Sequence, residues 1–352
     1  MTYFLLLAGV VLTAPICHKK LKLHKKSKDG TLIYIMLWTF ILVSICGLRR
    51  IDVGRDTSMY SWTYKMMSTY GSWKSAISGY TYLEFGYYGM QYLVSRIFDY
   101  QVFLFICAII SIVPIMVVVY RYSENKMMSI ILFITFPYYT FCMSGLRQAC
   151  ALGVIMLAYI AVREKRLLFF LLLMVLACSF HTSALLFLPI YWIDKIPYKK
   201  IIIFISVALM IGANIFKSAL WSIATLLARQ QYTENDAGGQ MMYLFMILTV
   251  ILGFYYRYKF TGENQDNKVL LYMQVIATII WPIASVNSAL FRMYYYYHIF
   301  FILYVPTLIV SIRKYMEKGI VTLGYYAIAL YFITTQVLPE MYKFNPYHFF
   351  WQ

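Results

Sequence analysis

The sequence predicts an all-α, polytopic integral membrane protein with about 12 transmembrane helices. Three observations support this fold class: 62% of the 352 residues are hydrophobic, only 13% are charged, and the mean hydropathy is +0.67. Soluble domains carry about 25% charged residues. The apolar residues also form continuous runs instead of alternating with polar ones, which excludes a transmembrane β-barrel. Soluble enzyme folds and intrinsic disorder are excluded by the same composition.

Apolar segments follow one another along the chain, and each is expected to form one membrane-spanning helix. They lie at 2–17, 31–48, 101–120, 127–143, 146–162, 167–181, 182–193, 201–216, 241–256, 269–287, 293–312 and 319–338. Most are long enough to cross a hydrocarbon layer of about 30 Å. The segment at 182–193 is short, and a helix break is expected at His181. We expect residues 1–352 to form a single transmembrane domain.

The charged residues predict the orientation of these helices. Residues 17–28 contain six lysines, so the positive-inside rule assigns this segment to the cytoplasm and the N-terminus to the outside. When the following segments are assigned alternately, 20 of the 31 Lys and Arg residues lie inside and the C-terminus lies outside. The net charge of +17 is therefore interpreted as a topology signal, and nucleic acid is not expected as a partner.

Two polar regions are not expected to cross the membrane. Residues 49–100 are predicted to form an outer loop or a re-entrant region, because 83–98 contains Glu84, Arg96 and two glycines. Residues 217–231 form an amphipathic segment that is predicted to lie flat in the outer interface.

The two sides of the membrane differ in the type of basic residue that they carry. The inner segments contain 15 Lys and 5 Arg, whereas the outer segments contain 4 Lys and 7 Arg. Lysine is sufficient for topology, but arginine makes planar, two-point contacts with phosphate and keeps its charge when it is buried. The outer side is therefore predicted to bind phosphate groups.

Two outer segments supply most of the candidate arginines. The segment 49–60 contains Arg49, Arg50, Asp52, Arg55, Asp56 and Tyr60. It is typical either of an anionic-substrate loop or of an interfacial loop with local ion pairs. In the segment 144–148, Arg147 and Gln148 lie in the first turn of a predicted helix whose positive dipole end faces outward. An anion at Arg147 is favoured over an arginine that only reaches toward the interface.

Two further outer segments contain candidate polar residues, and Glu84 lies among aromatic residues. His181, followed by Thr182 and Ser183, either stabilises the helix break or acts in proton transfer or substrate contact. Arg292 and Tyr296 lie four residues apart on one helix face, after Asn287, although the tyrosines there also suit an aromatic belt. Glu84 suits acid–base chemistry, carbohydrate stacking or an ordinary loop.

These segments give one set of candidate site residues. The candidate catalytic residues are Asp56, His181 and Glu84. The candidate residues for binding a diphosphate and a glycan are Arg49, Arg50, Arg55, Tyr60, Arg147, Gln148, Ser183, Asn287, Arg292 and Tyr296. No metal site and no cofactor are predicted, because the sequence contains no DxD-type pair, no HExxH and no nucleotide-binding glycine motif.

Five sequence elements, in this order and spacing, resemble the EpsG family. They are RRIDVGRDTSMY at 49–60, YLEFGYYG at 82–89, SGLRQACALG at 144–153, FHTSALLFLPIYW at 180–192 and NSALFRMYYYY at 287–297. The resemblance implies a Wzy-like polysaccharide polymerase of capsule, exopolysaccharide or O-antigen synthesis, with a GT-C-like fold. It also implies a multi-pass protein of the bacterial plasma (inner) membrane whose active site faces the periplasm or exterior.

The resemblance further implies substrates and partners. The substrate would be an undecaprenyl-diphosphate-linked oligosaccharide in the lipid bilayer, and a chain-length regulator and a flippase would be protein partners. Arg147 and Arg292, supported by Arg50 and Arg55, would bind the diphosphate, and His181 or Asp56 would activate the acceptor hydroxyl. Two alternatives stay open: a transferase of the O-antigen-ligase type, and a non-enzymatic flippase or transporter for lipid-linked oligosaccharides.

Overall fold

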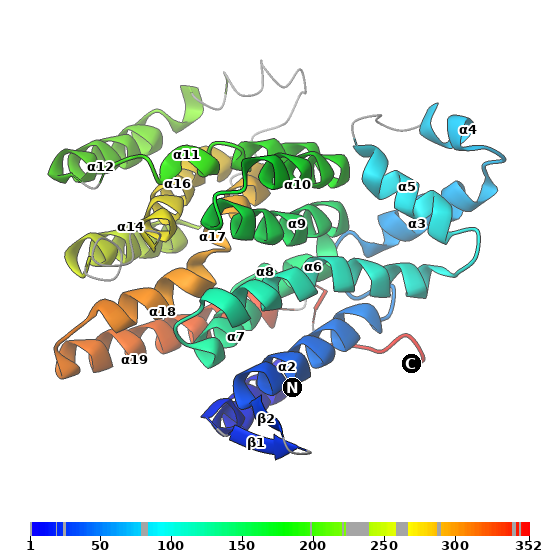
Figure 1. Cartoon of the computed structure of the whole chain (residues 1–352). Coiled ribbons are helices and arrows are strands. Elements are labelled where there is room, and N and C mark those ends of the chain that lie inside the picture. Colours follow the sequence, from blue (N-terminus) through cyan, green and yellow to red (C-terminus); the bar gives the residue numbers. More distant parts are fainter. Residues whose placement is uncertain are drawn as a thin grey trace. The chain divides into compact units, whose positions relative to one another are not determined.

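The computed structural model describes residues 2–18, 20–23, 26–78, 84–197, 199–219, 222, 239–257, 267–286, 290–339, 343–344 and 346–352. Its elements are helices, as predicted, apart from an antiparallel hairpin formed by β1 (Lys20–Leu23) and β2 (Lys26–Asp29) in the lysine-rich segment (Figure 1). The chain divides into two compact units, Met1–Leu185 with Ile320–Gln352, and Leu186–Gly319. The single transmembrane domain stays a prediction.

The first unit contains most of the described helices. They are α1 (Thr2–Thr13), η1 (Ala14–His18), α2 (Gly30–Gly47), α3 (Thr57–Thr69), α4 (Trp73–Ser78), α5 (Phe85–Val94), α6 (Tyr100–Tyr122), α7 (Lys126–Thr135), α8 (Tyr138–Ser144), α9 (Leu146–Arg163), α10 (Leu167–Phe180) and the π-helical turn η6 (Ile333–Val337). Two helices, η3 (Thr182–Phe187) and α19 (Tyr315–Phe332), cross the boundary between the units.

The second unit is built around one helix, α16 (Lys268–Ala284). The helices that contact it are α11 (Ile190–Ile193), α12 (Lys200–Ile215), α14 (Gln240–Tyr255), η5 (Leu290–Tyr294), α17 (Tyr295–His298) and α18 (Phe301–Ser311). Helices α14 and α18 are also connected, because the Tyr304 hydroxyl donates to the Thr249 carbonyl at 2.8 Å.

Among the described residues, four helices are long and apolar enough to cross a membrane: α2, α6, α9, and α19 continued by η6. Two bent pairs add up to two more spans, α7 with α8 at 50° and residues 292–298 with α18 at 41°. The other apolar helices of the described residues have 10–17 residues, fewer than the roughly 20 that a straight crossing needs. The structure therefore supports four to six spans by length and composition, and the larger expected number stays a prediction.

Close helix packing forms the centre of the first unit. Helix α9 packs between α6 and α10, and α6 also packs against α2. The approach of α9 to α6 depends on Gly153, because a Cβ at this position would overlap the carbonyl oxygen of Ile110. Small residues commonly allow such close contacts between membrane helices. As a result, 83% of the α9 span is buried.

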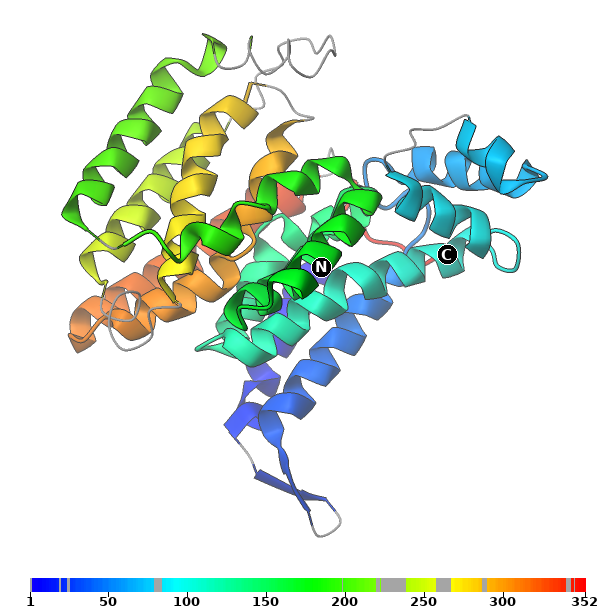
Figure 2. The same cartoon turned by 45° about the horizontal axis from the view of Figure 1, so that its top comes forward.

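Several distant segments meet where α2 ends and α9 begins. The backbone N–H of Arg50 donates to the carbonyl of His348 at 2.9 Å, so the C-terminal segment lies beside the segment 49–60. Near the beginning of α1, the Tyr3 hydroxyl lies 4.0 Å from the sulfur of Met143 at the end of α8. Helices α3, α4 and α5 lie at this end too, away from the β1–β2 hairpin (Figures 1 and 2). Both termini were predicted to share one side with this end, and the side of the membrane that it faces stays a prediction.

Candidate functional site

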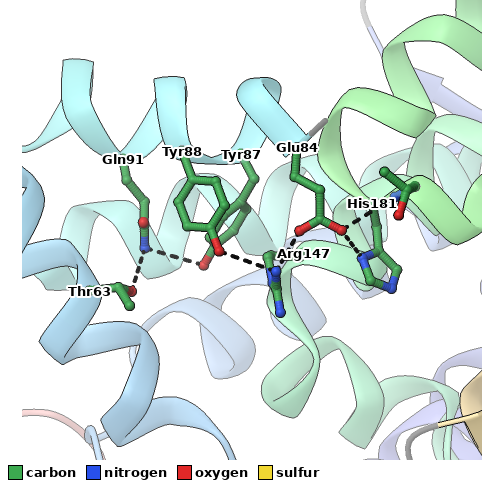
Figure 3. Close-up of polar contacts among 8 residues, drawn as sticks. Thr63, Glu84, Tyr87, Tyr88, Gln91, Arg147 and His181 are labelled. Carbon is green, nitrogen blue, oxygen red and sulfur yellow. Dashed lines mark hydrogen bonds and ion pairs between the residues drawn. The ribbon is translucent and has the colours of Figure 1, made fainter. Parts of the chain in front are cut away.

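Three of the predicted site residues meet in the first unit: Glu84, Arg147 and His181 (Figure 3). Arg147 Nη1 lies 2.5 Å from Glu84 Oε2, and His181 Nδ1 lies 2.5 Å from Glu84 Oε1. They come from three different places, the residue before α5, the first turn of α9 and the residue after α10. We call these three residues the Glu84 cluster. Three segments that the charge pattern assigns to one side of the membrane thus meet in one site.

The predicted helix break explains the position of His181. Helix α10 ends at Phe180, and His181 has an extended backbone with φ −156° and ψ 120°. The break leaves the N–H of Thr182, at the beginning of η3, without a partner in the preceding turn. Glu84 Oε1 accepts this N–H at 3.4 Å. The carboxylate of Glu84 therefore stabilises the beginning of η3 as well as binding His181.

Glycine at position 86 brings Glu84 to this break. A Cβ on Gly86 would overlap Oγ of Ser179 and would lie 3.1 Å from the Ser179 carbonyl carbon. The first turn of α5 can therefore lie against the last turn of α10 only because residue 86 has no side chain.

The electrostatic environment keeps Glu84 ionised. Its residue is 5% exposed, whereas the side chains of Arg147 and His181 are 27% and 26% exposed. Burial raises the pKa of the Glu84 carboxyl, but the hydrogen bond from His181 and the positive charge of Arg147 outweigh burial, so that the pKa is lowered. Glu84 is therefore a carboxylate at neutral pH, and it only accepts hydrogen bonds.

An ionised Glu84 determines which nitrogen of neutral His181 carries the proton. Because the carboxylate accepts from Nδ1, that nitrogen is the N–H donor, and Nε2 has the free lone pair. Among the residues drawn in Figure 3, the imidazole contacts Glu84 through Nδ1, and no dashed line reaches Nε2. The cluster therefore holds a half-buried imidazole and a half-buried guanidinium group on one carboxylate.

A comparison with family models identifies the chain. The EpsG family model matches residues 32–349, which include all three residues of the Glu84 cluster. The chain belongs to the EpsG family. This family is of the Wzy-like polysaccharide polymerase type, so membership and the apolar helices indicate an integral membrane protein of polysaccharide synthesis. Neither the curated proteins nor the solved structures gave a match.

The site of this EpsG-family protein includes contacts from two residues, Tyr88 and Gln91, that were not predicted from the sequence. The Tyr88 hydroxyl lies 3.2 Å from Arg147 Nη1. The amide nitrogen of Gln91, one turn after Tyr87, lies 3.3 Å from Thr63 Oγ1 and joins α5 to α3. Tyr88 follows Glu84 by four residues, and this helical spacing was a signal that could have identified it.

Arg49 has a structural position in the EpsG-family chain. It is fully buried, and its guanidinium donates to backbone carbonyls of Cys46, Val53 (3.3 Å) and Met143 (2.9 Å). These contacts connect the end of α2 to the end of α8. This placement does not support the predicted role of Arg49 in binding a diphosphate.

Of the other predicted residues of segment 49–60, Tyr60 reaches the Glu84 cluster, whereas Arg50, Arg55 and Asp56 have other positions. Arg50 forms a two-point ion pair with Asp52 at 2.7 and 2.8 Å, as the local ion-pair interpretation predicted. Arg55 is exposed, and Asp56 occupies the N-cap position of α3. Tyr60 is buried, contacts the ring of Tyr87 at 5.9 Å and interacts with Arg147, so it reaches the Glu84 cluster.

The remaining predicted residues lie beside the cluster, in the second unit or outside the described residues. Gln148 is buried next to Arg147 on α9, and Ser183 is half-buried in η3. Arg292 lies half-buried in η5 and Tyr296 fully buried in α17, both in the second unit. Asn287 and most of 217–231 are outside the described residues.

Neither a metal-binding group of side chains nor a disulfide is found in the part of the chain that the structure describes. No group of three His, Cys, Asp or Glu side chains there could hold a metal ion. The described cysteines are free thiols, four buried and one half-buried, and they pack as small hydrophobic residues.

Proposed function

We propose that this EpsG-family protein polymerises undecaprenyl-diphosphate-linked oligosaccharides. The growing glycan moves from its lipid diphosphate to a hydroxyl group at the non-reducing end of the next lipid-linked repeat unit. The observation that supports this proposal is the Glu84 cluster, in which one carboxylate within the family-matched region contacts both an imidazole and a guanidinium group.

His181 acts as the general base in this reaction. Nε2 takes the proton of the acceptor hydroxyl as its oxygen bonds to the anomeric carbon of the donor sugar. Glu84 holds the imidazole by Nδ1 and stabilises its cationic form, as a carboxylate does in a histidine–carboxylate pair. This contact favours His181 over Asp56 as the base.

Arg147 stabilises the leaving group. The bond between the anomeric carbon and the diphosphate oxygen breaks, and the lipid diphosphate leaves with the bonding electrons. A positioned donor at the developing anion contributes about 3 kcal/mol to transition-state stabilisation. The role of Arg292 in binding phosphate stays a prediction from the sequence.

We assign the site to the outer side of the bacterial plasma membrane. The lysine-rich hairpin precedes α2 and the segment 49–60 follows it, so a membrane crossed by α2 separates the two. Lysine-rich segments stay in the cytoplasm. The cluster, with segment 49–60, would then face the leaflet that holds translocated lipid-linked glycans.

An in vitro assay tests this function. Purified protein and lipid-linked repeat units are expected to give a ladder of polymers, whereas His181→Ala and Arg147→Ala should give none while remaining folded and monodisperse. Arg121→Ala is the matched control, because Arg121 pairs with Glu164 in an exposed ion pair outside the cluster.

Other products would distinguish the alternatives. A wild-type ladder from His181→Ala would refute the proposed base. Transfer of finished polymer to a different acceptor, without a ladder, would favour the ligase type. Lipid flipping without any glycosidic product would favour the transporter.

A further inference from the structure

Aromatic side chains continue from the Glu84 cluster along one side of α5. Tyr88 contacts Arg147, with its ring centroid 6.0 Å from the guanidinium carbon. Tyr92 follows four residues later on the same helix face. Trp73, the first residue of α4, packs edge-on against Tyr92 with ring centroids 5.5 Å apart. The guanidinium carbon of Arg96 lies 4.4 Å from the Tyr92 centroid. We call Tyr88, Tyr92, Trp73 and Arg96 the α5 aromatic surface.

The structure holds this surface in place and leaves it accessible. A Cβ on Gly89 would lie 3.0 Å from Cη2 of Trp73, so the indole covers α5 between the two tyrosines. Arg96 also donates to the carbonyl of Tyr70. Trp73 is 38% exposed, Tyr88 and Tyr92 are half-exposed, and Arg96 is exposed. A preorganised surface loses little conformational entropy when it binds a ligand.

We propose that the α5 aromatic surface binds the sugars of the lipid-linked substrate that lie next to the reacting sugar. This assignment rests on the proposed function. A pyranose ring has a face of C–H groups that packs on aromatic rings, and its hydroxyl groups accept hydrogen bonds from a planar guanidinium. The surface offers both features, and it begins at Arg147, where the reacting end of the substrate is assigned. A glycan can therefore continue from the cluster along α5 toward Arg96.

A second exposed stripe on α5 argues against the bilayer as the occupant of this surface. Leu93 is 66% exposed, and Ile97, in the turn after α5, is 76% exposed. Leu93 lies about 140° around the helix from Tyr88. These purely apolar side chains suit contact with lipid, whereas the arginine stacked on Tyr92 suits a polar ligand with apolar faces.

Steady-state transfer by the full-length protein tests this inference. The lipid-linked substrates are used with complete repeat units and with units shortened to the reacting sugar, and donor and acceptor are shortened separately. Trp73→Ala and Tyr92→Ala should each raise KM for the complete unit about fivefold with little change in kcat. When the shortened substrate lacks the bound sugars, neither substitution should change its KM. Whether this happens with the shortened donor or the shortened acceptor identifies the glycan that occupies the surface. Trp62→Ala, which removes an exposed tryptophan of α3, is the control.

The possible failures are distinguishable. If Trp73→Ala has the wild-type KM for complete units while His181→Ala is inactive, the glycan surface is refuted and the proposed function stands. An equal loss with complete and shortened substrates would indicate structural or bilayer anchoring, and it would also refute the surface. If the wild-type protein forms no polymer from lipid-linked repeat units, the proposed function and this inference both fail.

Discussion

At the scale of single residues, one carboxylate connects the two halves of the proposed chemistry. Glu84 binds the proposed base through one oxygen and the proposed phosphate ligand through the other. Glu164 is the matched control for this position. It is also an ion-paired glutamate, but its partners Arg121 and Arg166 are exposed and lie outside the cluster.

Glu84→Gln should therefore lower kcat strongly. The amide keeps the shape of the side chain but does not stabilise an imidazolium, so we expect a loss of about 100-fold or more. The measurement is the rate of polymer formation in vitro. Glu164→Gln should leave that rate unchanged, and equal rates for the two variants would contradict the positioning role of Glu84.

The lowered pKa of Glu84 also predicts a pH dependence of stability. Since the pKa is lower in the folded protein than the ordinary value of 4.5, ionised Glu84 stabilises the fold above that value. This contribution disappears as the pH falls through the lowered folded pKa. The difference in thermal unfolding midpoint between wild type and Glu84→Gln should thus be large at neutral pH and should shrink in acid. A difference that does not change with pH would contradict the ionic role.

At the scale of elements, the site depends on how closely one short helix approaches another. We expect Gly86→Ala to displace α5 from the end of α10, because the new Cβ overlaps Ser179. Overpacking of this kind costs about 1–3 kcal/mol, so the protein should unfold at a lower temperature and lose most polymerase activity. Gly71→Ala is the control, since no atom lies within 4 Å of a Cβ there. Wild-type stability and activity in Gly86→Ala would show that the approach is not required.

A second glycine tests the packing of the long helices. Gly153→Ala should lower the thermal stability more than Gly86→Ala, because α9 meets the backbone of α6 at this position. Gly324→Ala in exposed α19 meets no neighbouring atom and should be neutral or stabilising, as alanine favours helix by about 1 kcal/mol over glycine. The measurement is the thermal unfolding midpoint of each variant in detergent. A Gly153→Ala protein that is more stable than Gly86→Ala would contradict the close packing of α9 on α6.

At the scale of the whole molecule, the proposed orientation predicts labelling from opposite sides. Ser72, exposed between α3 and α4, lies at the same end as the cluster, whereas Lys165 is exposed after the other end of α9. In intact cells, Ser72→Cys should react with a membrane-impermeant maleimide, and Lys165→Cys should react only after the membrane is opened. The opposite pattern would place the cluster in the cytoplasm and refute the outer site.

The sequence was sufficient for the features that follow from local patterns. Apolar runs predicted the positions of most described helices, but not of α3, α4 and α5 in 49–100, and the alternation of charge predicted the break at His181. Contacts between distant residues were not predictable in this way: 97 residues separate Glu84 from His181. For the same reason Arg49 was assigned to the substrate, since its three carbonyl partners become visible only in the folded chain. The lysine-rich hairpin was likewise not anticipated, because lysine pairs carry no strand signal.

The shared carboxylate has a consequence for electroneutrality during the reaction. In the proposed reaction the base starts neutral, so the formal charges of Glu84, Arg147 and His181 are −1, +1 and 0 and sum to zero. When the imidazole takes the hydroxyl proton in this proposed step, the sum becomes +1 as the departing lipid diphosphate gains one negative charge. New opposite charges therefore arise as close neighbours, and their attraction offsets the cost of forming each of them in a poorly solvated place.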